Sequence, residues 1–259
     1  MFRIGGQMKV SKVGEGKVYL LNKGGKVWTD IAARFVRSER PVEEIIQSDY
    51  DPKIVRNILE SGHYAATEFD LLLFGVEGYS RVCEVQLVRK RLASYLIKSG
   101  RAELHGKRAF SIVAPDNVLD TKFTVNVKGE NVALSGRDLA AISEQWYEAG
   151  LEAGLPEEDL RYFKPQATEF KAIIGMNIHA LMDWLKIRMC QNAQTEIRDL
   201  ATKMCHLAKE AYPDLMEGAG PSCKVLGYCP EGRLQNANCR GKIPLKEDLL
   251  QAWKAYKSK

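Results

Sequence analysis

A run of basic residues that follows directly on an apolar stretch places the strongest constraint on this chain. Residues 86–101 hold five cationic side chains within sixteen positions. These side chains are Arg89, Lys90, Arg91, Lys98 and Arg101. Residues 82–88 are mostly apolar, so we expect this element to begin in the core and to carry its arginines to the edge. A solvated basic face is the simpler interpretation, but arginines fixed at the end of a packed element are suited to binding phosphate or carboxylate through paired, charge-assisted hydrogen bonds.

Length and charge narrow the class of partner. The chain has 259 residues, which is enough for one substantial core or two small ones. Its net charge of +5 is mild, and basic residues alternate with acidic ones, so we expect a small anionic ligand and no nucleic acid. We find no apolar run of about 18 residues that would span a membrane. The first ten residues lack the apolar stretch of a signal peptide, so we predict a cytoplasmic protein.

The cysteines are interpreted as reduced thiols, as is usual in the cytoplasm. Cys223, Cys229 and Cys239 have spacings that match no usual zinc pattern, and no histidine lies close to them in the sequence. We therefore predict that the chain holds no metal. Cys190 is interpreted as a buried helix residue.

Hydrophobic patterns and turn signals predict the first elements. Two short apolar runs within residues 8–22 are separated by glycines, which is typical of a hairpin. Thr29 or Asp30 is expected to cap a helix through residues 32–36. Asp51 followed by proline marks the start of the next helix.

The rest of the chain alternates between strands and helices. Further strands are expected at residues 69–76, 107–113, 122–127 and 170–176. Further helices are expected after Ser80, over 137–153, after Pro156, and over 178–187, 189–211 and 246–257. We see no internal repeat and no low-complexity linker. We therefore predict a single domain over residues 1–232 with a C-terminal helical extension at 233–259.

The basic segment resembles the signature of flavin-dependent thymidylate synthases. That signature has Arg-His-Arg, then two residues, Ser, a few polar residues, Ser, and an Arg two positions further on. Arg89, Arg91, Ser94, Ser99 and Arg101 stand in that order and spacing. The departures from the signature are Lys90 for its His, Leu96 and Ile97 for its polar pair, and Ala102 for its last aromatic residue.

Further motifs of the same family recur in the right order over roughly residues 50–232. His63 and Glu68 reproduce a Gly-His step that is followed five residues later by Glu. Arg161 with Pro165 resembles an Arg-x-x-x-Pro element. The remaining matches are Met176-Asn177, Arg188 with residues 193–198, and the tail segments 220–223 and 227–232.

The resemblance implies a fold and an assembly. The expected fold is mixed α/β (α+β), with a twisted, largely antiparallel sheet packed with long helices. The expected assembly is a homotetramer whose active sites are shared between subunits.

The resemblance also implies an activity and a set of site residues. The enzyme would methylate C5 of deoxyuridylate (dUMP) with methylenetetrahydrofolate, reduced FAD and NADPH as reductant. Arg188 and Ser99 are the expected catalytic residues. The expected dUMP residues are Gln86, Arg89, Ser99, Gly100, Arg101, Arg161 and Arg188. The expected FAD residues are His63, Arg89, Lys90, Arg91, Asn177, His179 and Asp183.

The departures leave a second hypothesis. They fall mainly on the flavin side, where His179 replaces an Arg and Asp183 replaces an Asn of the family. A buried or cofactor-facing aspartate is unfavourable next to a pyrophosphate unless it is paired. The alternative is therefore a paralog that binds a pyrimidine nucleotide but has lost or altered its flavin chemistry, with a regulatory role or a different C5 modification.

Overall fold

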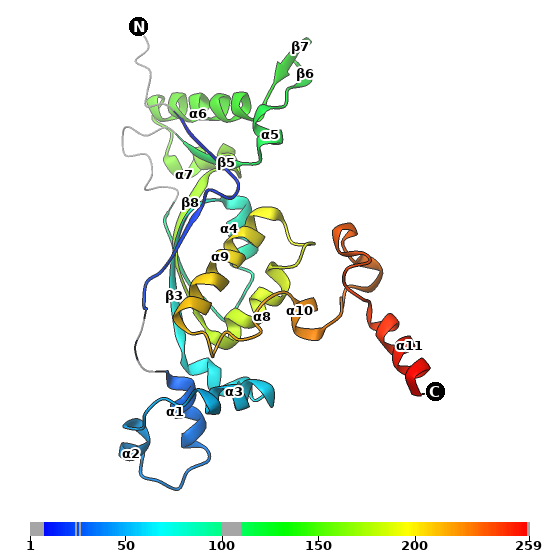
Figure 1. Cartoon of the computed structure of the whole chain (residues 1–259). Coiled ribbons are helices and arrows are strands. Elements are labelled where there is room, and N and C mark those ends of the chain that lie inside the picture. The colour runs from blue at the N-terminus through cyan, green and yellow to red at the C-terminus, as the bar shows by residue number, and fades with distance from the viewer. Residues whose placement is uncertain (1–7, 24, 26, 100–109, 258–259) are drawn as a thin grey trace. The chain divides into compact units, whose positions relative to one another are not determined.

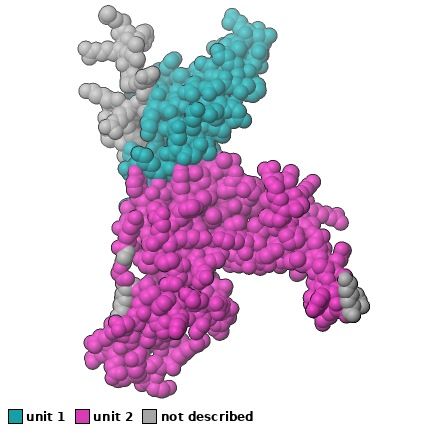
Figure 2. Space-filling view, in the orientation of Figure 1, with its two compact units in different colours: residues 1–17, 76–89, 96–173 teal, residues 18–75, 90–95, 174–259 magenta. Residues whose placement is uncertain are grey.

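The computed structural model describes residues 8–23, 25, 27–99 and 110–257 (Figure 1). Its described residues form the predicted mixed α/β fold with an antiparallel sheet. Figure 2 shows two compact units. Unit 1 comprises residues 1–17, 76–89 and 96–173, and unit 2 comprises residues 18–75, 90–95 and 174–259.

The central sheet has four strands in the order β2-β3-β8-β4. Their bounds are β2 Lys17–Leu20, β3 Leu71–Ser80, β8 Glu169–Asn177 and β4 Ser94–Ile97. Along β3 the buried residues Leu72, Phe74 and Val76 alternate with more exposed ones, as expected for a strand with one face on a core. The strands predicted over 69–76 and 170–176 are confirmed as β3 and β8. β8 extends one residue beyond each predicted end, whereas β3 begins two residues later than predicted and extends to Ser80.

The predicted N-terminal hairpin is wrong. β1 (Lys9–Lys12) pairs in parallel with β5 (Ser111–Ala114), whereas β2 joins the central sheet. The glycine before β2 lies against the end of β3. A Cβ atom on Gly16 would lie 2.5 Å from the ring of Tyr79, so only glycine permits this close approach to the end of β3.

A second core lies in unit 1. Phe110, Ile112, Leu119, Tyr147 and Leu160 are buried there together. The contributing helices are α5 (Asp116–Asp120), α6 (Gly136–Glu152) and α7 (Glu157–Leu160). The helix predicted over 137–153 is confirmed as α6, and its Ser135 forms a capping box with Asp138. Strands β6 (Phe123–Val127) and β7 (Glu130–Leu134) form an exposed antiparallel hairpin.

The N-terminal helices of unit 2 are α1 (Trp28–Phe35), α2 (Val42–Ile46) and α3 (Pro52–Glu60). The cap of α3 by Asp51 is confirmed. Capping of α1 by Thr29 or Asp30 is wrong, because Asp70 supplies the carboxylate. Asp70 accepts hydrogen bonds from the Trp28 and Thr29 amides at 2.9 and 2.7 Å, and it is itself buried. A distant carboxylate at a helix N-terminus leaves no local sequence signal.

Two helices cover the core of unit 2, α8 (Ile178–Arg188) and α9 (Thr195–Ala211). The predicted start of the second helix at residue 189 is wrong, since residues 189–194 form a turn and Gln194 caps α9. The tail holds α10 (Ser222–Leu226), two short 3-10 turns and the predicted terminal helix α11 (Lys246–Lys257). Within the described residues, no helix combines the length and apolar character needed to cross a membrane.

Candidate active site

The basic segment begins on a short packed helix, α4 (Arg81–Leu87). Ser80 caps this helix as predicted, and its hydroxyl accepts a hydrogen bond from the Cys83 amide. Leu87 is fully buried, whereas Arg89 in the following turn is exposed. The expected arrangement, a packed element that carries its arginines to the edge, is therefore confirmed.

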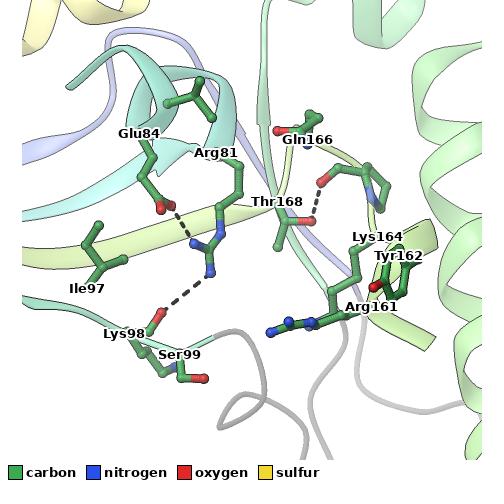
Figure 3. A pocket seen from close by; sticks show the side chains of 12 residues that line it. Arg81, Glu84, Ile97, Lys98, Ser99, Arg161, Tyr162, Lys164, Gln166 and Thr168 are labelled. Atoms are coloured by element: carbon green, nitrogen blue, oxygen red, sulfur yellow. Dashed lines mark hydrogen bonds and ion pairs between the residues drawn. The ribbon is translucent and has the colours of Figure 1, made fainter. Parts of the chain in front are cut away.

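Unit 1 contains a cavity of about 610 Å³ beside α4 (Figure 3). Ser99 and Arg161, two of the predicted nucleotide residues, line it. Arg161 begins the 3-10 turn after α7, and its side chain extends into the cavity on the side of Ser99 (Figure 3). The sequence motifs, 62 positions apart at residues 99 and 161, thus contribute to one cavity.

Cations outnumber anions around this cavity. Arg81, Lys98 and Lys164 line it with Arg161, and Glu84 is the one acidic side chain in its described lining. Glu84 accepts a hydrogen bond from Arg81 at 2.5 Å, and Arg81 also reaches the Lys98 carbonyl at 3.5 Å. The excess positive charge suits a dianionic phosphate, which arginine can bind through two parallel hydrogen bonds.

The structure places the other predicted nucleotide residues as follows. Gln86 lies on α4 and donates a hydrogen bond back to the Val82 carbonyl at 3.3 Å. Arg89 is in the turn after this helix, and Arg188 ends α8 in unit 2. Gly100 and Arg101 lie outside the described residues.

Sequence reasoning missed two cationic cavity residues, Arg81 and Lys164, and it named Lys98 in the basic run without assigning it to the nucleotide site. A signal for Arg81 was present, because it starts a helix three positions before Glu84 and can pair with it across one turn. Lys164 directly precedes the Pro165 of the Arg-x-x-x-Pro element, but nothing in that pattern gives the direction of its side chain.

On the flavin side, α8 carries several of the predicted residues in unit 2. Asn177 caps it, and its side-chain oxygen accepts a hydrogen bond from the Ala180 amide at 2.7 Å. His179 and Asp183 follow one helical turn apart, on the same face. The cap fixes the start of the helix, so it sets the positions of both side chains.

The two most unusual residues pair with each other. Lys90 Nζ lies 3.0 Å from Asp183 Oδ2, and Lys186 Nζ lies 3.6 Å from Asp183 Oδ1. The hydrogen bond from Lys90 holds the pKa of the Asp183 carboxyl below its ordinary value, with smaller contributions from the charges of Lys90, Lys186 and His179. The negative charge that Asp183 brings to this side is therefore compensated.

His179 contacts two residues that follow the Gly-His step of the family pattern. Its Nδ1 lies 3.2 Å from Glu68 Oε1, and its ring lies 5.9 Å from that of Tyr64. His63, the histidine of that step, is exposed just after α3. Tyr64 and His179 also line a second cavity, of about 330 Å³, together with the cation Lys186.

Tyr95, on strand β4, contacts the turn that carries Lys90 and Arg91. Its hydroxyl donates a hydrogen bond to the Lys90 carbonyl at 2.9 Å. Burial raises the pKa of Tyr95 to about 12, although the nearby Arg188 opposes this shift. The tyrosine therefore stays protonated and keeps donating to the turn that presents Lys90 and Arg91.

The residues of unit 2 fit an anionic dinucleotide cofactor. Lys90 and Lys186 neutralise the charge of Asp183. Arg91 is exposed beside Lys90 in the same turn. His179 keeps one ring nitrogen besides the Nδ1 that contacts Glu68. The donor set is cationic and rich in N–H groups, as phosphate binding requires.

Comparison with known proteins agrees with this chemistry. The sequence profile of the family described as thymidylate synthase complementing protein matches residues 23–214. A flavin-dependent thymidylate synthase from Nitratidesulfovibrio vulgaris is 36% identical over 207 residues, which cover 79% of this chain and 81% of the relative. A flavin-dependent thymidylate synthase from Thermococcus onnurineus is 37% identical over 203 residues, which cover 76% of this chain and 79% of the relative.

A solved structure supports the fold alone. The crystal structure of a UMP/dUMP methylase, PolB, from Streptomyces cacaoi bound with 5-Br dUMP matches with a TM-score of 0.64. The match covers 81% of this chain and 96% of that one, at 18% sequence identity.

Fold and cavity together define a mixed α/β protein with a cation-lined cavity. The sequence matches make the assignment specific. The chain belongs to the flavin-dependent thymidylate synthase family, a family of methyltransferases.

Proposed function

We propose that this chain methylates C5 of dUMP, with methylenetetrahydrofolate as the one-carbon donor, FAD as the hydride carrier and NADPH as the reductant. The observation that carries the proposal is the cavity of about 610 Å³ in unit 1. It holds Ser99 and Arg161 of the family pattern beside three further cations. The flavin dependence of the relatives supports FAD, and the 5-Br dUMP bound to the structural neighbour supports a uridine nucleotide.

The nucleotide phosphate is assigned to this cavity. Arg161 offers a planar fork of N–H donors, and the Ser99 hydroxyl can donate or accept beside it. By the family pattern Gln86, Arg89, Gly100 and Arg101 complete the binding of phosphate, sugar and base. Binding through the phosphate fixes the uracil ring in position for reaction. Such positioning can account for a large part of the decrease in activation free energy that an enzyme achieves.

The chemical step needs charge stabilisation on the ring. C5 of uracil is a weak nucleophile, and it becomes reactive when a cation near O2, N3 or O4 stabilises the negative charge that develops. The family pattern gives this role to Arg188. No cysteine nucleophile is needed in this route.

The FAD cofactor is assigned to a second, mainly cationic set of residues. His63, Arg89, Lys90, Arg91, Asn177 and His179 would hold FAD, with Asp183 acting through its ion pair with Lys90. When bound, FAD supplies the hydride that reduces the transferred methylene to a methyl group. Lys90 and Asp183 hold each other in position, so the pair takes over the place of the His and Asn of the family.

We assign the working assembly to a homotetramer with shared sites. Apolar side chains on the outer face of the sheet support an interface. Leu21 and Leu71 are each 52% exposed in the single chain. Leu71 and Leu73 both lie within 4 Å of the Cβ position of Gly175, so the glycine lets these leucines lie flat on the sheet.

A second candidate function is a nucleotide-binding relative with lost or altered flavin chemistry. Leu96 is 72% exposed and Ile97 lines the cavity of unit 1, where the family has polar residues. Neither of these apolar side chains can form a hydrogen bond to a base or to a cofactor. This candidate predicts that dUMP binds and that FAD does not.

One purification of the full chain separates the two candidates. The proposed enzyme is yellow, is bleached by NADPH, and releases tritium from [5-³H]dUMP only when methylenetetrahydrofolate is present. Colourless protein that takes up no added FAD, yet is stabilised thermally by dUMP, supports the second candidate. Protein that is stabilised by neither ligand would contradict both.

Restoring the family residues tests the flavin side directly. We expect Lys90→His together with Asp183→Asn to keep or raise FAD affinity, because the two residues form one pair. Lys90→His alone should lower it, since Asp183 then loses its 3.0 Å partner. Equal affinity in both variants, measured by flavin fluorescence titration, would contradict a role of the pair in cofactor binding.

A further inference from the structure

Four of the six cysteines line one cavity of about 390 Å³ in unit 2, which no part of the proposed reaction uses. These residues are Cys190, Cys223, Cys229 and Cys239. They come from separate segments, namely the turn after α8, the helix α10, the loop that follows it and the last 3-10 turn. Cys190 is half-buried in a turn, so the interpretation as a buried helix residue is wrong.

The segment that brings three of these cysteines together has almost no apolar core. From residue 221 to residue 257, Cys229 and Gln235 are the only buried side chains. Polar contacts hold the segment instead. Asn192 donates to the Leu234 carbonyl at 2.9 Å, and Asn236 donates to the Gln191 carbonyl at 3.2 Å. A small loop-rich segment of this kind normally needs a covalent or metal staple to stay folded.

We propose that Cys190, Cys223, Cys229 and Cys239 bind one structural Zn²⁺ ion as a four-thiolate site. Four cysteines are a regular ligand set for closed, tetrahedral zinc. Each thiol releases one proton to solvent as its sulfur bonds to the metal, which leaves a site of net charge −2. Lys186 and Lys242 also line this cavity.

The four thiols line one cavity but are not arranged around an ion. Cys223 is within electrostatic range of both Cys190 and Cys229. In the described part of the chain, no group of three or more His, Cys, Asp or Glu side chains is placed so that it could hold a metal ion, so the proposed site requires these side chains to rearrange. A cysteine sulfur is redirected by rotation about a single bond, and metal binding in small sites is coupled to such local folding.

Sequence spacing alone could not reveal this site. The three tail cysteines do not follow a usual zinc pattern, and the fourth ligand precedes them by 33 positions on another element. The fold brings Cys190 to the tail because α8 ends beside the segment that carries Ser222, whose hydroxyl donates to the Lys186 carbonyl at 3.2 Å.

Metal analysis of the full chain tests the proposal. We expect about one zinc per chain by mass spectrometry after purification without chelators. We expect Cys229→Ser and Cys239→Ser to lose it, and Cys205→Ala, which alters a buried cysteine outside the cavity, to keep it. Cobalt exchanged into the wild-type protein should give the intense sulfur-to-metal charge-transfer band of thiolate ligation, a readout that does not depend on any variant folding.

Other outcomes overturn the proposal. Zinc-free protein with six titratable thiols would show that the cysteines only pack. Two or four missing thiols without metal would show disulfides in this cavity. Detection of iron together with inorganic sulfide would show that the cysteines bind an iron–sulfur cluster and not zinc. Chelation adds a last readout, because metal removal should expose residues 221–257 to proteases, and unchanged resistance would contradict a stapling role.

Discussion

Lys90 stands where the family signature has His, and Asp183 stands where the family has Asn. Asp183 alone would place an unmatched carboxylate beside a phosphate site, whereas Lys90 keeps a cation there. Together they form an ion pair of 3.0 Å between residues 93 positions apart in the sequence. Only the fold shows that the two departures are one compensated change, because the motifs give no distance between them.

The pair has a predictable dependence on pH. The pKa of Asp183 is lowered in the folded chain, so its contribution to stability is present above the ordinary carboxyl pKa and is lost as the pH falls through the folded value. We expect Lys90→Met to cost roughly 0.2–1 kcal/mol at pH 7, a small value because half of the Asp183 side chain is exposed. Urea unfolding should show this cost shrink below about pH 4.

The background variant Asp183→Asn is the control for this measurement. In that background Lys90→Met should cost nothing at either pH, since the partner charge is already gone. A cost that stays the same in both backgrounds would mean that Lys90 acts through its packing.

Arg161 should dominate the affinity for the nucleotide phosphate. A hydrogen bond to a charged group contributes about 1.5–3 kcal/mol, so Arg161→Ala should weaken dUMP binding roughly 10- to 100-fold, and Arg161→Lys by less. Arg137→Ala is the matched control, because Arg137 is an exposed arginine of unit 1 that pairs with Asp120 outside the cavity. Calorimetric titration with dUMP measures both, and equal losses would contradict the assignment of the cavity.

At the scale of elements, local signals succeeded where the cap lies next to its helix. Asp51 and Ser80 each cap the helix that the sequence predicted from them. Predictions failed where a partner is distant, as with Asp70 at the start of α1 and the pairing of β1 with β5. Long-range pairing depends on register and burial across the chain, which periodicity does not encode.

The residues of the candidate site also divide into those that the sequence predicted and those that it did not. The family pattern identified Ser99 and Arg161 although they are far apart in the sequence. It gave no sign of Arg81, because this residue lies before the signature and reaches the cavity only through the geometry of α4. Side-chain direction at the end of an element is a property of packing, and the sequence alone does not supply it.

Asn177 caps α8 and is proposed to contact FAD as well, and substitutions can separate the two roles. Asn177→Ala removes the cap and should destabilise the fold by about 0.5–2 kcal/mol. Asn177→Asp keeps a capping oxygen, so we expect stability near that of the wild type. If Asn177 also contacts FAD, both variants should bind the cofactor more weakly, because aspartate repels the pyrophosphate. Normal FAD affinity in the aspartate variant would show that Asn177 caps the helix and does not contact FAD.

At the scale of the whole molecule, strands β3 and β8 each contribute residues to both compact units. The nucleotide residues Ser99 and Arg161 belong to unit 1, and the flavin-side residues His179 and Asp183 belong to unit 2. The single domain predicted over residues 1–232, with its extension at 233–259, stays a prediction.

The outer face of the sheet gives the last test, that of the assembly. Leu71 is 52% exposed in the single chain, so a charge there disturbs the monomer little but disrupts an apolar interface. We expect Leu71→Glu to convert the proposed homotetramer to smaller species in light scattering and to lower activity, because the proposed shared sites need more than one subunit. Leu155→Glu is the control, at a loop leucine of unit 1 that is 51% exposed. A tetramer that survives Leu71→Glu, or a wild-type monomer with full activity, would contradict an assembly through this face.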